Sequence, residues 1–264
     1  IKAMVGRSLD NQFPKEPGVR SEKPLLEVKN IHRKGVLHNV SFKAYGGEVL
    51  GFSGLVGAGR TETMRAIFGA DPIDGGEIYI RGEKVDIKNP KDAIRAKIAF
   101  LTEDRKGQGL ILNESIQNNL ILANLKGYQK GLFLSQKDMD TMGEGRIQEL
   151  SIKCPNQEER VGQLSGGNQQ KVVIGKWLNT NADIYILDEP TRGIDVGAKV
   201  EVYQVINRLV KEGKCVIMVS SEMPEILGMS DRVLVMREGR ITGEMSRSTD
   251  AFNQESVMKA AWEV

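Results

Sequence analysis

Four short apolar segments constrain the fold of this chain more than any other feature. Each is four residues long, carries no charged side chain, and is separated from the next by a stretch with helical patterns. Strands buried on both faces have this appearance, as in a parallel sheet covered by helices on each side. The sequence therefore predicts an α/β core built on a mostly parallel sheet. The expected strands are Val49–Phe52, Ile98–Leu101, Ile184–Leu187 and Val216–Val219.

Other segments alternate polar and apolar residues, as half-exposed antiparallel strands do. Leu25–Ile31 and Leu37–Ala44 form one such pair, so we expect an N-terminal antiparallel β subdomain. Hairpin turns are expected at residues 81–83 and 238–239, where glycine interrupts the alternation. The flanking strands are expected at Glu77–Ile80, Lys84–Ile87, Val233–Met236 and Arg240–Met245.

Helical patterns fill most of the remaining chain. Thr61–Phe68 and Lys171–Leu178 each follow a glycine-containing segment, and Ala198–Glu212 places five apolar residues on one face. Residues 113–163 show helical patterns and no buried-strand signal. We therefore expect a helical subdomain of about residues 106–170, inserted between two parts of the α/β core.

Composition excludes several classes of protein. The 264 residues are 40% hydrophobic and 27% charged, with a net charge of +2, so no global charge favours nucleic acid or an anionic membrane. Cys154 and Cys215 fit neither a metal-ligand spacing nor a disulfide framework. No apolar run approaches the roughly 18 residues that a membrane-spanning helix needs.

A glycine-rich loop follows the first buried strand and opens a helix. Its pattern, Gly54-x4-Gly59-Arg60-Thr61, places small residues where backbone N–H groups can wrap phosphates, and it places a hydroxyl where Mg²⁺ would lie. A plain strand-to-helix turn is the alternative. The predicted phosphate-binding residues are Gly54, Gly57, Ala58, Gly59, Arg60, Thr61 and Glu62.

Arg60 occupies the position where such loops carry lysine. Lysine offers a compact point charge, whereas guanidinium is wide, planar and suited to two-point contacts. Attraction to phosphate can therefore survive while the geometry needed for transfer is lost. The hypothesis is weak nucleotide binding with poor hydrolysis at this site.

Leu164-Ser165-Gly166-Gly167 precedes another helix. Ser165 and the N–H groups of Gly166 and Gly167 could hold a phosphate at the helix N-terminus, with Gln169 beside them. A loop in which Ser165 merely caps the helix is the alternative.

Two acids end the third buried strand. The carboxyl ends of parallel strands meet at one edge of a sheet, so Asp188 and Glu189 are expected near the glycine loop. We predict that Asp188 holds Mg²⁺ through water and that Glu189 is the catalytic residue that polarises the attacking water. Acids that only cap a following helix are the alternative.

The three motifs occur in this order within residues 54–221, and together they resemble the ATP-binding cassette (ABC) ATPases. Longer runs are similar to the second ATPase half of bacterial monosaccharide importers of the ribose, galactose and methyl-galactoside type. These runs are Gly54–Glu62, Thr102–Lys106, Leu164–Lys171, Leu187–Lys199 and Val219–Glu225.

In that family each nucleotide lies between the P-loop of one ATPase domain and the Leu-Ser-Gly-Gly signature of another. The resemblance implies that this chain supplies its signature to a partner, while its own site is degenerate at three positions. Arg60 replaces lysine, Glu103 replaces the glutamine that generally contacts Mg²⁺, and Ser221 replaces the histidine that usually contacts the γ-phosphate. His32 is the only ring where an adenine-stacking aromatic is expected.

The resemblance also implies the cofactors, the partners and the location. ATP and Mg²⁺ are the expected cofactors, with Thr61, Glu103 and Asp188 at the metal. The expected partners are a first ATPase half in the same polypeptide, a transmembrane permease and, indirectly, an external sugar-binding protein, at the cytoplasmic face of the membrane. Residues 1–24 are expected to be the tail of a preceding domain and a linker, and residues 25–264 the ATPase domain.

Two other functions stay open. A regulatory module that holds nucleotide without turnover would use the same motifs. A nucleic-acid-linked ABC ATPase is disfavoured, because such proteins carry zinc-finger cysteines or long coiled-coil insertions that this sequence lacks.

Overall fold

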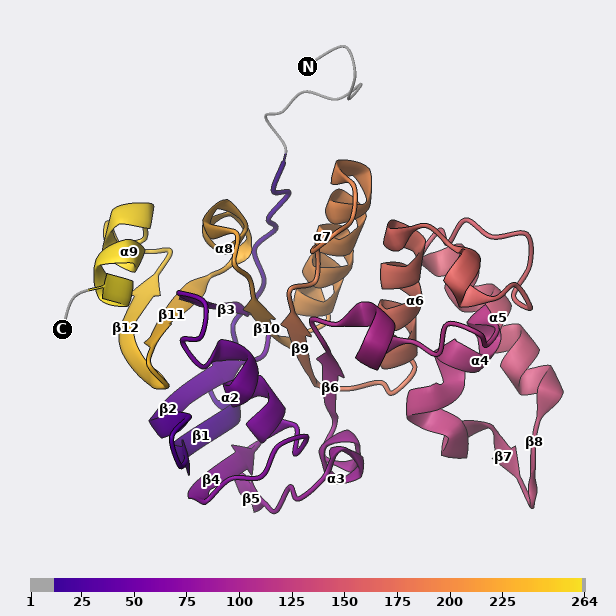
Figure 1. Cartoon of the computed structure of the whole chain (residues 1–264), viewed down its shortest axis with the longest axis horizontal. Helices are drawn as coiled ribbons and strands as arrows, with labels where there is room; N and C mark the ends of the chain where they lie inside the picture. The colour runs from indigo at the N-terminus through magenta and orange to yellow at the C-terminus, as the bar shows by residue number, and fades with distance from the viewer. Residues whose placement is uncertain (1–11, 263–264) are drawn as a thin grey trace, which may run out of the picture.

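The computed structural model describes residues 12–262, and a six-stranded sheet forms its centre (Figure 1). The strand order is β12-β11-β3-β10-β9-β6, and every neighbouring pair is parallel except β11 with β12. The four predicted buried strands are confirmed, and β11 adds a fifth parallel strand that the sequence indicated only as half of a hairpin. The bounds are β3 Val49–Gly54, β6 Ile98–Leu101, β9 Ile184–Asp188, β10 Cys215–Val219, β11 Arg232–Arg237 and β12 Arg240–Ser246.

Hydrophobic residues on alternate positions of these strands enter two separate cores. Ile184 and Ile186 face one core, while Tyr185 and Leu187 face the other. Helices α2 (Arg60–Ile67) and α3 (Pro90–Arg95) cover the first face. Helices α6 (Gly166–Leu178), α7 (Val196–Lys211), α8 (Met223–Met229) and α9 (Gln254–Trp262) cover the second. Burial on both faces explains why the strands are continuously apolar.

The expected antiparallel subdomain is present. It is a four-stranded sheet of order β2-β1-β4-β5, which shares a hydrophobic core with α2 and lies at the lower left of Figure 1. Its strands are β1 Pro24–Arg33, β2 Leu37–Tyr45, β4 Gly75–Ile80 and β5 Glu83–Val85.

The region expected to be helical extends to the right of the sheet in Figure 1. It contains α4 (Ile116–Ile121), η3 (Leu122–Tyr128), α5 (Gln136–Glu149) and η4 (Val161–Gln163). Within this region, a small hairpin of β7 (Gln129–Lys130) and β8 (Phe133–Leu134) was not predicted, and its strand residues are exposed. A π-helical turn, η2 (Arg105–Gly109), joins β6 to this region.

Residues 12–23 contain no regular helix or strand, as expected for an aperiodic segment, but they lie against the domain. The Phe13 ring packs on Tyr203 with centroids 5.7 Å apart, and Lys15 forms an ion pair with Asp231 at 2.7 Å. The part of the expected preceding tail in residues 1–11 lies outside the described residues.

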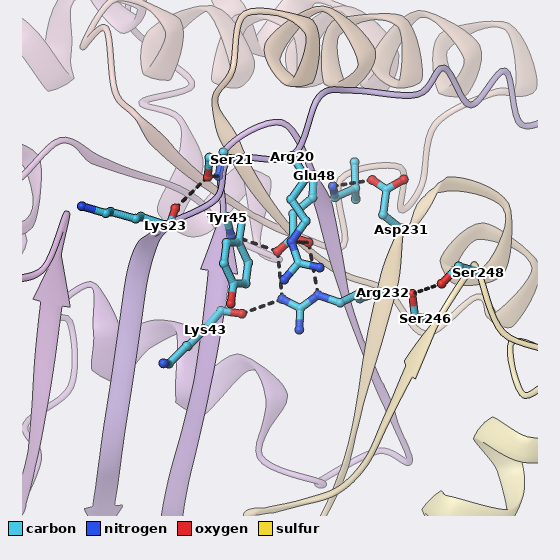
Figure 2. Close-up of polar contacts among 12 residues, drawn as sticks. Arg20, Ser21, Lys23, Lys43, Tyr45, Glu48, Asp231, Arg232, Ser246 and Ser248 are labelled. Carbon is cyan, nitrogen blue, oxygen red and sulfur yellow. Dashed lines mark hydrogen bonds and ion pairs between the residues drawn. The ribbon is translucent and has the colours of Figure 1, made fainter.

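A buried ionic cluster joins this segment to the sheets (Figure 2). Glu48, before β3, accepts hydrogen bonds from Arg232 Nη2 at 2.8 Å and from Nε at 3.1 Å, and Arg20 lies 3.5 Å from the same carboxylate. Arg232 also donates to the Lys43 carbonyl at 2.6 Å. Burial lowers the pKa of Arg232, but its contacts with Glu48 and Glu244 outweigh burial and hold that pKa above its usual value.

Candidate nucleotide-binding site

The glycine loop connects β3 to α2, as predicted. Gly54 has φ of 152°, and a side chain there would lie 2.3 Å from the Met236 carbonyl oxygen, so only glycine fits. The turn between β11 and β12 supports the loop, because Gly239 N–H donates to the Ala58 carbonyl at 2.9 Å. Helix α2 then begins at Arg60, which directs its N-terminus at the space that the loop surrounds.

Arg60 crosses from α2 to the end of β10. Its Nη1 donates to the Ser220 carbonyl at 2.8 Å, so the guanidinium lies between the glycine loop and the Ser220-Ser221 segment. Its charge also favours the ionised forms of Asp188 and Glu189. The cation is therefore present at the site but is engaged by a backbone carbonyl.

Asp188, at the end of β9, is fully buried, and neither carboxylate oxygen has a hydrogen-bond partner of good geometry among residues 12–262. Burial raises the pKa of Asp188 to about 6, while the nearby Thr61 hydroxyl and the Arg60 charge act in the opposite direction. A buried carboxylate without a partner is costly unless something else binds it. Asp188 and Thr61 are thus suited to Mg²⁺, which takes one or two protein oxygens together with phosphate and water.

Glu189 follows with an uncommon backbone conformation, φ of +50°. Its Oε2 accepts a hydrogen bond from the Ser221 hydroxyl at 3.2 Å, so the structure brings these two predicted site residues together. Burial raises the pKa of Glu189, and Ser221 and Arg60 oppose that shift. The carboxylate lies beside Asp188 in sequence and faces the same edge of the sheet.

Two predicted residues have other partners in this structure. Glu103 forms an ion pair with Arg192 and is not held against Asp188 or Thr61, so its role at the metal stays a prediction. The His32 ring lies close to Gly75, its neighbour across the antiparallel sheet, whereas the Leu37 side chain occupies the space that a side chain on Gly59 would enter.

The Leu-Ser-Gly-Gly segment opens α6, which begins at Gly166 rather than at Lys171 as expected. Ser165 occupies the N-cap position, but its hydroxyl accepts from the Asn168 side chain at 3.0 Å and makes no capping bond to a backbone N–H. The capping alternative therefore lacks its defining bond. Gln169 is buried and donates to the Val161 carbonyl at 3.3 Å, which directs its side chain inward.

A family profile described as "ABC transporter" matches residues 37–192. The chain therefore belongs to the ABC transporter family. Solved structures share its fold: an ATP-binding cassette in an ADP conformation covers 91% of this chain, and 96% of that structure is covered, with a TM-score of 0.72 and 21% identity. A dimeric cassette with ADP and phosphate gives a TM-score of 0.72 at 23% identity, and the match covers 85% of this chain and 99% of that structure. The predicted α/β P-loop core with β and helical subdomains is confirmed.

Curated relatives are named for sugar import. The ribose import ATP-binding protein RbsA of Oceanobacillus iheyensis is 51% identical over 99% of this chain, which covers 52% of that protein. A protein of Burkholderia ambifaria named for ribose/galactose/methyl galactoside import is 47% identical, and the match covers 99% of this chain and 51% of that protein. The chain thus spans about half the length of the curated relatives it matches. Within residues 12–262, no helix is long and apolar enough to cross a membrane.

Proposed function

We propose that this chain is an ATP-binding domain of a bacterial monosaccharide importer, and that it couples ATP binding and hydrolysis to uptake. The observation that carries this proposal is the buried Asp188 carboxylate at the glycine loop, which has the Thr61 hydroxyl beside it and no hydrogen bond of good geometry among residues 12–262. The names of the relatives support the sugar class, with ribose and galactose as the candidates.

Each group at the site has a role in this proposal. The backbone of Gly54–Glu62 binds the phosphates, while Thr61 and Asp188 hold Mg²⁺, with Glu103 as a further ligand. When bound, Mg²⁺ neutralises charge on the phosphates. Glu189 orients the attacking water and accepts its proton. Ser221 holds the Glu189 carboxylate by a hydrogen bond at 3.2 Å but brings no positive charge to the γ-phosphate.

The chain's own site is weakened by its substitutions. Arg60 already donates one of its N–H groups to the Ser220 carbonyl, which restricts how its guanidinium can approach phosphate, and the Glu103 carboxylate is paired with Arg192. Both existing contacts compete with the nucleotide and its metal, so they reduce the favourable free energy of nucleotide binding. We therefore propose that this site binds Mg-ATP weakly and turns it over slowly.

The signature segment serves a partner in this proposal. The Ser165 hydroxyl makes no backbone capping bond, and Ser165, Gly167 and Asn168 line an open pocket at the start of α6. A γ-phosphate bound to another ATPase domain would fit there. We propose that the partner is the first ATPase half of the same polypeptide, because this chain covers only about half of each relative.

The assembly in this proposal docks under a transmembrane permease that receives sugar from an external binding protein, at the cytoplasmic face of the membrane. Leu110, Ile116, Leu120 and Ile121 are buried and belong to the core, whereas Ile111 is 48% exposed. Ile111 is therefore the better candidate for contact with the permease. A nucleotide-holding module without turnover remains the second candidate, since Arg60 and Glu103 are both engaged within the chain.

Thr61→Val tests the metal site with a side chain of nearly the same shape. In excess Mg²⁺ we expect the affinity for ATP to fall about tenfold, the cost of one lost ligand interaction, whereas in EDTA the variant and the unaltered chain should bind equally. Titration calorimetry measures both conditions. Thr242→Val, which removes a hydroxyl that bonds the Ala260 carbonyl, is the matched control. Equal binding by Thr61→Val and the unaltered chain in Mg²⁺ would contradict the proposal.

A further inference from the structure

The buried carboxylate of Glu225 has no role in the predicted site but contacts the segment that follows Glu189. Glu225 on α8 is fully buried, and its Oε1 accepts hydrogen bonds from the Thr191 hydroxyl at 2.6 Å and from the Tyr203 hydroxyl at 2.9 Å. Its Oε2 has no hydrogen-bond partner among residues 12–262. Since burial of a carboxylate is unfavourable, the two hydroxyl bonds are what hold it in place. The bond from Thr191 attaches α8 to the segment that follows Glu189, and the bond from Tyr203 attaches it to α7.

The same segment is bonded from its other side by the signature helix. Gln170, on the second turn of α6, is buried, and its Nε2 donates to the Pro190 carbonyl at 2.6 Å. Its Oε1 accepts from Arg105 Nη1 at 3.3 Å, so the amide is fixed in both directions. Pro190 is therefore attached to α6, and Thr191 is attached to α8.

Glu189 itself shows why such attachment is needed. Its φ of +50° is a left-handed conformation that non-glycine residues adopt only when their surroundings hold them there. The N–H of Glu189 donates to the Val219 carbonyl at 2.9 Å, and its carbonyl accepts from the Arg192 N–H at 3.2 Å. The bonds at Pro190 and Thr191 fix the two residues between these anchors, which prevents the turn from relaxing.

We propose that Gln170 and Glu225 are positioning residues that clamp the segment Glu189–Arg192 between the signature helix α6 and helix α8. The clamp fixes the Glu189 carboxylate beside Ser221, and it ties the chain's own nucleotide site to the helix whose N-terminus is offered to a partner. The part that the clamp plays in hydrolysis rests on the proposed function. The restraint of the segment Glu189–Arg192 does not need nucleotide to be bound.

Hydrogen exchange of the nucleotide-free chain tests the clamp without any need for activity. Thr191→Val removes the hydroxyl and keeps the shape, so the amides of Glu189 and of residues 191–193 should exchange about tenfold faster, with the central sheet unchanged. Thr191→Ser keeps the hydroxyl and should exchange like the unaltered chain. Gln170→Met should accelerate the same amides, and Thr242→Val should not. Unchanged exchange in both clamp variants, or a uniform acceleration throughout the sheet, would overturn the proposal.

A kinetic measurement adds the functional half of the test. Where hydrolysis is measurable, in the unaltered chain or in an Arg60→Lys background, Thr191→Val should lower kcat about tenfold and leave the Mg-ATP dissociation constant within twofold. Thr191→Ser should restore kcat. A loss of binding equal to the loss of kcat would overturn the role in positioning. If neither background binds ATP, the proposed function fails, and hydrogen exchange still decides whether the clamp exists.

Discussion

At pH 7.5 and without nucleotide, Asp188→Asn is expected to be more stable than the unaltered chain by about 2 kcal/mol. Burial raises the pKa of Asp188 from an ordinary 3.8 to about 6. A pKa of about 6 in place of 3.8 corresponds to roughly 3 kcal/mol that the ionised, buried carboxylate costs. A buried amide at the same position still carries part of this cost. This loss of stability is what we expect at a position where the proposed function needs a carboxylate.

The pH dependence of this difference has a definite sign. As pH rises from about 4 to about 6, the unfolded chain releases the Asp188 proton while the folded chain retains it, so the stability of the unaltered chain falls. The advantage of Asp188→Asn should therefore be near zero at pH 4 and greatest above pH 6. Urea unfolding at several pH values measures it, and the difference between the two proteins cancels the titration of other carboxylates.

Ligand binding should reverse the order of the two proteins. Saturating Mg-ATP stabilises a chain that binds it, so the melting temperature of the unaltered chain should rise while that of Asp188→Asn stays nearly constant. An Asp188→Asn variant that is less stable than the unaltered chain at pH 7.5, or that gains as much from Mg-ATP, would contradict the assignment of Asp188 to the metal.

Arg232→Leu is expected to lower the free energy of unfolding by about 3 kcal/mol. Arg232 neutralises the Glu48 carboxylate, whose side chain is only 1% exposed, and removal of one partner leaves a buried charge without compensation. Arg20 also approaches Glu48 but is 47% exposed, so Arg20→Leu is a matched control with an expected loss below about 1 kcal/mol.

Denaturant unfolding with a double variant separates charge from packing in this cluster. Glu48→Gln combined with Arg232→Leu removes the uncompensated charge, so it should recover part of the stability that Arg232→Leu loses. Equal losses for Arg232→Leu and Arg20→Leu would show that the cluster in Figure 2 does not join the two sheets in the way described.

The central sheet could be predicted because its strands are buried on both faces, which leaves a continuous apolar run in the sequence. The parallel pairing of β11 with β3 could not, since the run Val233–Met236 precedes a turn and suits a hairpin equally well. The β7–β8 hairpin escaped prediction because its strands have two residues each and carry no periodicity. Local pattern identifies strands, whereas pairing across the sheet depends on the whole chain.

The site divides in a similar way. The placement of Thr61, Asp188 and Glu189 near one another was predictable because each follows a strand or a glycine loop whose geometry fixes the direction of the side chain, and their roles stay predictions. The contacts of Gln170 with Pro190 and of Glu225 with Thr191 join residues 20 and 34 positions apart, so no spacing in the sequence indicates them. The engagement of Arg60 with Ser220 likewise depends on the placement of β10 beside β3.

The measurement that tests the account most directly is equilibrium binding of Mg-ATP to this chain and to Arg60→Lys, with phosphate release followed in the same samples. The account predicts weak binding and slow release for the unaltered chain, and at least tenfold tighter binding once lysine replaces the arginine that Ser220 engages. Tight binding with steady phosphate release by the unaltered chain, unimproved by lysine, would contradict a weakened site and make Arg60 a working phosphate ligand.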